Sequence, residues 1–183
     1  MEKDTDATVL QIARRIEEIR TLRGISQWEL AQRAQYQRTW VSRTEGAGVS
    51  FSLDTLDRYA AALDVDPLSL VTSGALLPRK AEDKSTLRER LAINVIRLRD
   101  AQNLSQESLS INARLGRHFV SQVERENTRS SIPNLQKLAD ALGVPLSELF
   151  KQVDAASVNL KNSRRTRSKR IRKLDVKAAQ PDE

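Results

Sequence analysis

The side chains of this chain that could do chemistry are hydrogen-bond donors and acceptors rather than nucleophiles or metal ligands. The sequence has no cysteine and one histidine, His118, which excludes disulfides, thiolate metal sites and most imidazole metal sites. It has no Gly-rich phosphate loop, nucleophile elbow or paired His/Cys set, so we expect no enzyme activity, cofactor or metal. What remains is two short segments rich in arginine, serine, threonine and glutamine, around residues 38–43 and 117–122.

These two segments carry side chains that suit the edges of nucleobases. Helical spacing places Val41 and Val120 inward and turns two sets of polar side chains outward. The first set is Arg38, Thr39, Ser42 and Arg43, and the second is Arg117, His118, Ser121 and Gln122. Arginine can bond guanine bidentately and glutamine can bond adenine in the same way, and each good pair discriminates by about 1–3 kcal/mol.

Both segments lie within an internal repeat that has an offset of 79 residues. Residues 12–71 align with residues 91–150 without a gap, and 17 of the 60 aligned positions are identical. Two similar units of this size present two copies of one surface, which predicts a target that has its own repeat.

The apolar residues follow helical spacing and glycine and proline are sparse, so we predict an all-α fold. Ser26-x-x-Glu29 and Thr86-x-x-Glu89 have the pattern of a capping box at a helix start. The helices expected in the first unit are residues 7–23, a short helix from Ser26, residues 38–45, a helix from Ser52 and a brief one from Pro67. Those expected in the second begin at Thr86 and then cover 105–113, 117–124, 131–142 and 145–150.

This pattern predicts four parts of the chain. They are a first domain at 1–71, a linker at 72–84, a second domain at 85–153 and a basic tail at 154–183. Thirteen linker residues can extend to about 43 Å. Domains this small bury barely enough apolar surface to fold alone.

The net charge of +7 is concentrated in the tail. Residues 1–78 carry 9 basic and 11 acidic side chains, whereas residues 151–183 carry 10 and 4. Residues 161–173 hold eight basic groups and no acidic one, so we predict that this segment is disordered when free and binds phosphates without sequence preference. The predicted phosphate contacts are Arg164, Arg165, Arg167, Lys169 and Arg170. The sequence has no membrane span, and we expect a cytoplasmic, nucleoid-associated protein.

The motif Ser-Gln-x-x-Leu-x-x-x-Ala, a three-residue turn and Arg-x-(Trp/Phe)-Val-Ser-x-x-Glu occurs in both repeats. It resembles the helix-turn-helix of the lambda-repressor-like (Cro/Xre-type) family. The resemblance implies two five-helix helix-turn-helix domains in tandem and a function as a sequence-specific DNA-binding transcriptional regulator, typically a repressor.

The resemblance also implies roles for particular residues. Positions 38, 39 and 43 would read bases, and Gln27 and Gln106 would bind backbone phosphate where a helix start favours an anion. Since the two outward sets differ, we predict two non-identical half-sites about 34 Å apart on double-stranded DNA. The sequence leaves open whether the chain also forms a homodimer or binds a protein.

The first repeat departs from the family pattern. The glycine usual in the turn is Gln35 here and Arg114 in the second repeat, so each turn is either strained or reshaped. Thr44 takes a slot that is apolar in the second repeat, and Trp28 has no aromatic counterpart. Trp40 and Phe119 occupy matching positions and are assigned to packing.

These departures leave two alternatives open. One is a protein-interaction module, an antitoxin or antiactivator, in which one repeat binds a protein. The other is a non-specific nucleoid or plasmid-partition protein that relies on the basic tail.

Overall fold

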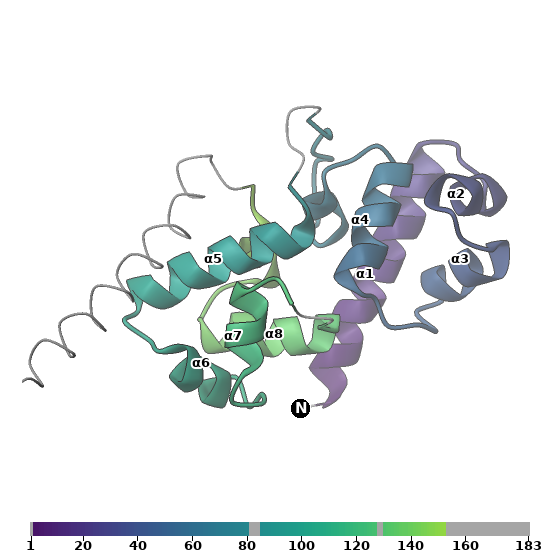
Figure 1. The fold of residues 1–183 in the computed structure, drawn as a ribbon. Helices are drawn as coiled ribbons and strands as arrows, with labels where there is room; N and C mark the ends of the chain where they lie inside the picture. The colour runs from purple at the N-terminus through teal and green to yellow at the C-terminus, as the bar shows by residue number, and fades with distance from the viewer. Residues whose placement is uncertain (1, 81–84, 128–129, 153–183) are drawn as a thin grey trace, which may run out of the picture. The chain divides into compact units, whose positions relative to one another are not determined.

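The computed structural model describes residues 2–80, 85–127 and 130–152, with side chains from residue 7 onward. The described residues form α-helices and two short 3₁₀ helices, and those up to Lys151 belong to one compact unit (Figure 1). The all-α prediction is therefore confirmed. The predicted tail, 154–183, lies outside the described residues.

The helices of the two repeats follow each other in the same order. The first repeat contains α1 (Glu2–Leu22), α2 (Gln27–Ala34), α3 (Arg38–Glu45), α4 (Leu53–Ala62) and the 3₁₀ helix η1 (Pro67–Leu70). The second contains α5 (Leu87–Ala101), α6 (Gln106–Asn112), α7 (Phe119–Glu124), α8 (Ile132–Ala141) and the 3₁₀ helix η2 (Leu146–Phe150).

Two predicted helix starts are corrected. Helix α1 begins at Glu2 rather than near Ala7. Helix α7 begins at Phe119, so Arg117 and His118 precede it instead of forming its first turn. The physical reason is that the Val120 N–H donates to the Ser110 hydroxyl at 3.1 Å, whereas the equivalent Val41 N–H donates to the Gln37 carbonyl at 3.3 Å and so allows α3 to begin at Arg38.

One of the two predicted capping boxes is complete. The Thr86 hydroxyl accepts from the Glu89 N–H, and the Glu89 carboxylate accepts from the Thr86 N–H. The Ser26 hydroxyl likewise accepts from the Glu29 N–H at 3.1 Å. The Glu29 carboxylate, however, accepts from Arg33 at 2.6 Å, because that residue lies one helical turn further along α2. The reciprocal half of the Ser26 box was therefore wrongly predicted.

The backbone turns at the same four places in each repeat, although glycine occupies only some of them. Gln35 and Arg114 have φ of 56° and 54°, so the turn between the two motif helices keeps its left-handed residue in both repeats and is not reshaped. The other three equivalent pairs with positive φ are Gly24 and Asn103, Ala47 and Glu126, and Asp64 and Gly143.

The polar Thr44 is accommodated in the core by a partner that the second repeat lacks. The Tyr59 hydroxyl donates to Thr44 Oγ1 at 3.0 Å, and both residues are fully buried. Burial raises the pKa of Tyr59 to about 12, so its hydroxyl remains a donor. At the same two positions the second repeat has Val123 and Leu138, an apolar pair. Thr44 is therefore a satisfied core residue.

The two repeats pack against each other through equivalent surfaces. Helix α1 packs against α8, α4 packs against α5, and η1 meets η2. Since α5 and α8 are the equivalents of α1 and α4, the first two contacts are the same contact made in both directions (Figure 1). Such reciprocity is the signature of an approximate two-fold axis.

Individual residues follow the same symmetry. Ser52 and Ser131, which differ by the repeat offset of 79, form an isolated antiparallel bridge with each other. The Leu87 N–H donates to the Asp57 carboxylate at 3.1 Å, and the equivalent residues Thr8 and Gln136 are joined at 3.4 Å. The chain therefore folds as an intramolecular pseudo-dimer.

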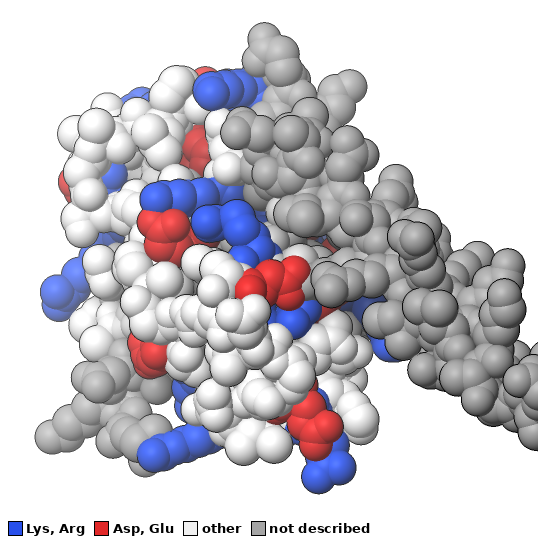
Figure 2. Space-filling view, turned by 90° about the vertical axis from the view of Figure 1, so that its left-hand side faces the viewer, with Lys and Arg blue, Asp and Glu red and all other residues white. Residues whose placement is uncertain are grey.

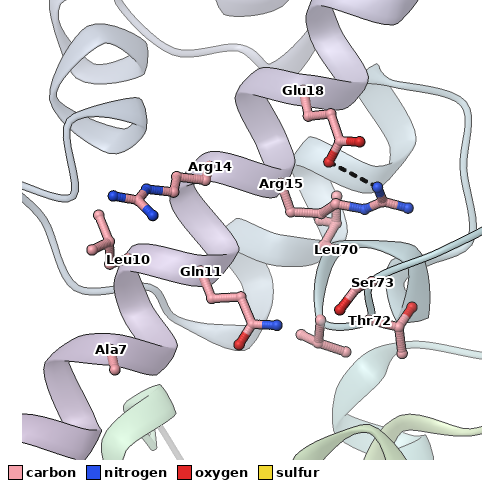
Figure 3. Close-up of a pocket in the computed structure, with 10 residues that line it drawn as sticks. Ala7, Leu10, Gln11, Arg14, Arg15, Glu18, Leu70, Thr72 and Ser73 are labelled. Atoms are coloured by element: carbon pink, nitrogen blue, oxygen red, sulfur yellow. Dashed lines mark hydrogen bonds and ion pairs between the residues drawn. The ribbon is translucent and has the colours of Figure 1, made fainter.

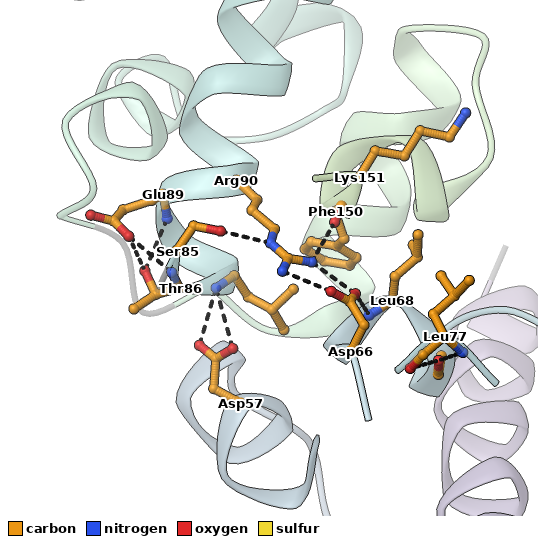
Figure 4. Close-up of polar contacts among 12 residues, drawn as sticks. Asp57, Asp66, Leu68, Leu77, Ser85, Thr86, Glu89, Arg90, Phe150 and Lys151 are labelled. Carbon is orange, nitrogen blue, oxygen red and sulfur yellow. Dashed lines mark hydrogen bonds and ion pairs between the residues drawn. The ribbon is translucent and has the colours of Figure 1, made fainter. Parts of the chain in front are cut away.

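One buried ion pair breaks this symmetry. The guanidinium of Arg90 donates to both carboxylate oxygens of Asp66 at 2.8 Å, and the two side chains are only 2% and 3% exposed (Figure 4). Arg90 also donates to the Ser85 hydroxyl and to the Phe150 carbonyl. The equivalent positions hold Gln11 and Pro145, which cannot form an ion pair.

The described part of the predicted linker contacts the first repeat. The Asp66 N–H donates to the Leu77 carbonyl at 2.9 Å, and the Leu77 N–H donates to the Ser69 hydroxyl at 2.9 Å. Val65 and Pro78 form an antiparallel bridge. The domain boundaries remain a prediction.

Replacing the interface residue Asp57 by Asn is expected to remove a pH-dependent part of stability. Burial raises the pKa of Asp57 from 3.8 to about 6, against the opposing effects of the Leu87 N–H, Arg90 and Arg79, while Asp54 adds to the rise. A carboxyl whose pKa is higher in the folded state stabilises the fold below about pH 4, and this contribution is lost as the pH rises through about 6. Allowing for solvent screening, we expect the loss to be about 1–2 kcal/mol.

The measurement is the free energy of unfolding by urea between pH 4 and pH 8 for the wild type and Asp57→Asn. The difference between the two curves should change between pH 4 and 6 and then level off. Glu17→Gln, which neutralises an exposed carboxylate on α1, controls for loss of charge. A pH-independent difference for Asp57→Asn would contradict the prediction.

Candidate nucleic-acid interface

The predicted base-reading side chains of the first repeat all lie on the exposed face of α3. Arg38, Thr39, Ser42 and Arg43 are exposed. Val41 on the opposite face is fully buried, together with Thr44. This division follows from the helical period, and it leaves the polar face of the helix accessible to a partner.

The second repeat presents its set from α7 and from the turn before it. Arg117, His118 and Gln122 are exposed and Ser121 is half-buried, while Val120 and Val123 are fully buried. Arg117 is not unpartnered, because its Nε lies 3.2 Å from Glu107 Oε1 on α6. The structure thus brings each set together on one face, as the sequence predicted.

A buried polar network anchors α3, the helix that carries the predicted base-reading side chains of the first repeat and is called its recognition helix below; α7 is the equivalent helix of the second repeat. Arg20 on α1 contacts both carboxylate oxygens of Glu45, at 2.5 and 3.0 Å, and also donates to the Ile25 carbonyl. The Gln27 amide donates to Glu45 Oε2 at 2.8 Å. Hydrogen bonding to Glu45 raises the pKa of Arg20. Helices α1, α2 and α3 are therefore tied together at the single carboxylate of Glu45.

The second repeat contains the same network at the equivalent residues. Arg99 donates to Glu124 Oε1 at 2.6 Å and to the Leu104 carbonyl, and the Gln106 amide donates to Glu124 Oε2 at 2.6 Å. The Arg99 and Glu124 side chains are only 9% and 6% exposed. The role of these arginines was not predicted from the sequence, although Arg20 and Arg99 are identical residues at equivalent positions and could have indicated it.

The network also defines what Gln27 and Gln106 can do. Both were predicted to bind DNA phosphate, and both are half-buried with one amide N–H bonded to a glutamate. A primary amide has a second N–H, so each residue retains a donor for an anion. Their phosphate contact remains a prediction.

A further anchor is found only in the second repeat. The hydroxyl of buried Ser110 accepts from the Val120 N–H at 3.1 Å and donates to the Gln106 carbonyl at 2.8 Å. It thereby links the start of α7 to α6. The equivalent residue in the first repeat is Ala31, and sequence reasoning gave no signal for this contact.

The aromatic residues of the two helix-turn-helix motifs differ in how deeply they are buried. Trp40 and Phe119 pack against the core, as predicted, and the Trp40 ring lies 6.0 Å from that of Tyr36. The Trp40 indole N–H is buried without a hydrogen-bond partner among the described residues. Trp28, near the start of α2, is 62% exposed and differs from both.

Charge is mixed on the side of the molecule where α5 and α6 lie. Figure 2 shows lysine and arginine next to aspartate and glutamate on this face, not a field of one sign. Charge on this face is therefore carried by individual side chains of both signs. The predicted tail contacts, 164–170, lie outside the described residues.

A groove of about 410 Å³ lies beside α1 and is separate from the predicted interface (Figure 3). Arg15 forms part of its wall and donates to Glu18, to the Ser69 carbonyl and to the Gly74 carbonyl. None of the predicted DNA-contact residues lines it. Within the described ranges, no group of His, Cys, Asp and Glu could hold a metal ion. No helix there is long and apolar enough to cross a membrane.

Both repeats match known families by sequence. A family profile described as helix-turn-helix matches residues 95–149, and another described as a helix-turn-helix domain matches residues 11–70. These matches include α2 with α3 and α6 with α7, the elements that carry the exposed polar sets.

Individual proteins are similar over about the length of one repeat. The chain is 38% identical over 74 residues to a "Neisseria hypothetical transcription factor" of Neisseria meningitidis serogroup B (strain ATCC BAA-335 / MC58), covering 40% of this chain and 70% of that protein. It is 36% identical over 56 residues to "Control protein C.MunI" of Mycoplasma sp, covering 31% and 76%. The crystal structure of the hypothetical transcription factor NHTF from Neisseria is 37% identical with a TM-score of 0.37, covering 41% and 86%.

Removing the charge of Glu45 or Glu124 is expected to destabilise the protein strongly. Glu45→Gln leaves the largely buried Arg20 without the counter-charge of Glu45, which costs about 3–5 kcal/mol. Glu124→Gln should cost somewhat less, because Arg99 keeps an ion pair with the partly exposed Asp100 at 3.1 Å. The measurement is the free energy of unfolding for each variant. Glu29→Gln, which breaks the exposed pair with Arg33, is the matched control and should cost less than about 1 kcal/mol. Equal losses in all three variants would show that the two networks do not anchor the helices.

Proposed function

The chain belongs to the helix-turn-helix family of Cro/C1-type DNA-binding regulators, and we propose that a single chain binds two adjacent DNA half-sites with its two repeats. Each half-site would receive one recognition helix, α3 or α7, in the major groove. The proposal makes the chain the one-polypeptide counterpart of a dimer.

The observation that supports this proposal most directly is the reciprocal packing of the repeats. Contacts of α1 with α8 and of α4 with α5 relate the two helix-turn-helix units by an approximate two-fold axis. The backbone of duplex DNA also has two-fold symmetry, and dimeric helix-turn-helix proteins use theirs to engage half-sites about 34 Å apart. A packed interface fixes how the two helices lie relative to each other, so the proposal does not require an extended linker.

The two half-sites are proposed to differ in sequence. Arg38 and Arg117 occupy the same position and would favour guanine in both half-sites. Thr39 is aligned with His118, and Arg43 is aligned with Gln122. Arginine favours guanine and glutamine favours adenine, so the difference between Arg43 and Gln122 is expected to make the operator only partly palindromic.

Phosphate contacts would add affinity without adding sequence preference. We assign these contacts to the second amide N–H of Gln27 and of Gln106, and to the basic residues of the tail. Neutralising phosphates releases counterions, so binding should weaken as salt concentration rises. Similarity to a protein named a control protein supports a role in regulating transcription, for which repression is the proposed direction.

The alternative of a protein-binding repeat is less well supported. One reason to suspect it was Thr44, and the Tyr59 hydroxyl accounts for this residue within the core. The exposed polar set on α3 gives the first repeat a surface suited to DNA. Two features that favour this alternative remain: the acidic balance of residues 1–78 and the exposed Trp28.

The test is selection of bound DNA from a random pool with the full chain, followed by footprinting of the selected site. We expect a bounded site with two dissimilar half-sites whose centres lie about one helical turn apart. Arg38→Gln and Arg117→Gln should each relax base preference in one half-site only, by about 1–3 kcal/mol for the base concerned.

Lys137→Gln on α8 makes the same charge change outside the two motifs and should leave the selected sequence unaltered. Selection of a single half-site, or protection without a boundary, would contradict the proposal. The second outcome would instead support the non-specific nucleoid protein.

A further inference from the structure

The second residue of α2 differs in chemistry from the second residue of its equivalent, α6. Trp28 occupies this position in α2, and Glu107 occupies it in α6. We propose that Trp28 is a DNA-contact residue that packs on the sugar–phosphate backbone beside Arg38, whereas Glu107 weakens the second repeat by competing with DNA for Arg117. This inference rests on the proposed function and adds that the two half-sites are bound with unequal strength.

The contact between Glu107 and Arg117 locates this position relative to the interface. Glu107 Oε1 lies 3.2 Å from the Nε of Arg117, a residue predicted to read bases. A side chain at this position therefore reaches the rim of the surface that faces DNA. It lies within range of the same nucleotide that the arginine would contact.

The first repeat shares one anchor with the second, which allows the position of Trp28 to be inferred from that of Glu107. The preceding residues, Gln27 and Gln106, donate to Glu45 and Glu124 at 2.8 and 2.6 Å. Two identical anchors fix the start of α2 against α3 and the start of α6 against α7 in the same way. By this equivalence we infer that Trp28 lies near Arg38, as Glu107 lies near Arg117.

The exposure of Trp28 is explained if DNA covers it. An indole ring that is 62% exposed leaves apolar surface in water, and the first repeat buries its other aromatic residues at least partly. Tryptophan has a flat apolar face that can pack on deoxyribose and an N–H that can donate to a phosphate oxygen. It carries no charge that would repel the DNA backbone.

Glu107 has the opposite effect on its half-site. Its carboxylate repels phosphates, and the guanidinium of Arg117 must leave it to bond a base. The pair is solvent-exposed, with side chains 69% and 55% exposed, so it can break, but its loss reduces the net gain from DNA. The first repeat, although acidic overall, therefore has at the edge of its DNA-facing surface a side chain that favours DNA binding more than that of the second repeat.

The experiment replaces each of the two side chains separately in the full-length protein and measures the affinity of each variant for the selected operator. Trp28→Glu should weaken binding about tenfold and Glu107→Gln should strengthen it about threefold at low salt. Footprints should show that Trp28→Glu loosens protection of the first half-site only. Both positions are exposed on the helix surface, and thermal unfolding of each variant verifies that it folds.

Fluorescence gives an independent measurement. The spectrum of the wild type minus that of Trp28→Phe isolates the emission of Trp28 from that of Trp40. This difference should shift to shorter wavelength or be quenched when operator DNA is added.

The outcomes separate this inference from the proposed function. If the wild type binds a two-part operator but Trp28→Glu binds it equally well and the Trp28 emission is unchanged, the inference is wrong and the function stands. Emission that changes with protein concentration in the absence of DNA would place Trp28 in a protein contact and also overturn it. Failure of the wild type to select any two-part operator would instead reject the proposed function.

Discussion

The recognition surface depends on a buried carboxylate that joins three helices in each repeat. Helices α3 and α7 have eight and six residues, which is too short for a helix to persist by its own hydrogen bonds. Glu45 and Glu124 fix their ends to α1 and α5 through Arg20 and Arg99. These carboxylates face inward, and Arg38, Thr39, Ser42 and Arg43 are left on the outer face of α3.

A second constraint acts between the repeats. The reciprocal contacts of α1 with α8 and α4 with α5 fix the spacing of the two recognition helices. The symmetry is approximate, since the Arg90–Asp66 ion pair has no equivalent in the other half of the interface. The two repeats are thus related by an approximate two-fold axis but differ in the side chains of their interface and of their exposed polar sets. Unlike exposed sets are what the proposed binding to two unlike half-sites requires.

The sequence was sufficient to predict the helices and the exposed sets because both depend on local periodicity. The offset of 79 residues aligned Arg38 with Arg117 and Ser52 with Ser131. The structure pairs the two serines across the interface and exposes both arginines, although only Arg38 begins its helix. What could not be predicted depends on residues distant in sequence. The Tyr59 hydroxyl that satisfies Thr44 and the packing of the repeats belong to this class, as does the bond from the Val120 N–H to the Ser110 hydroxyl at the start of α7. The roles assigned to the exposed residues on DNA remain predictions.

The most direct test of the central claim is the mass of the complex formed on a duplex that contains one two-part operator. Light scattering or native mass spectrometry at saturation should show that the duplex gains one chain of 20.6 kDa. Both half-sites should be protected in that same complex. A gain of two chains, with each protecting one half-site, would mean that the repeats of a single chain do not span the operator and would contradict the account.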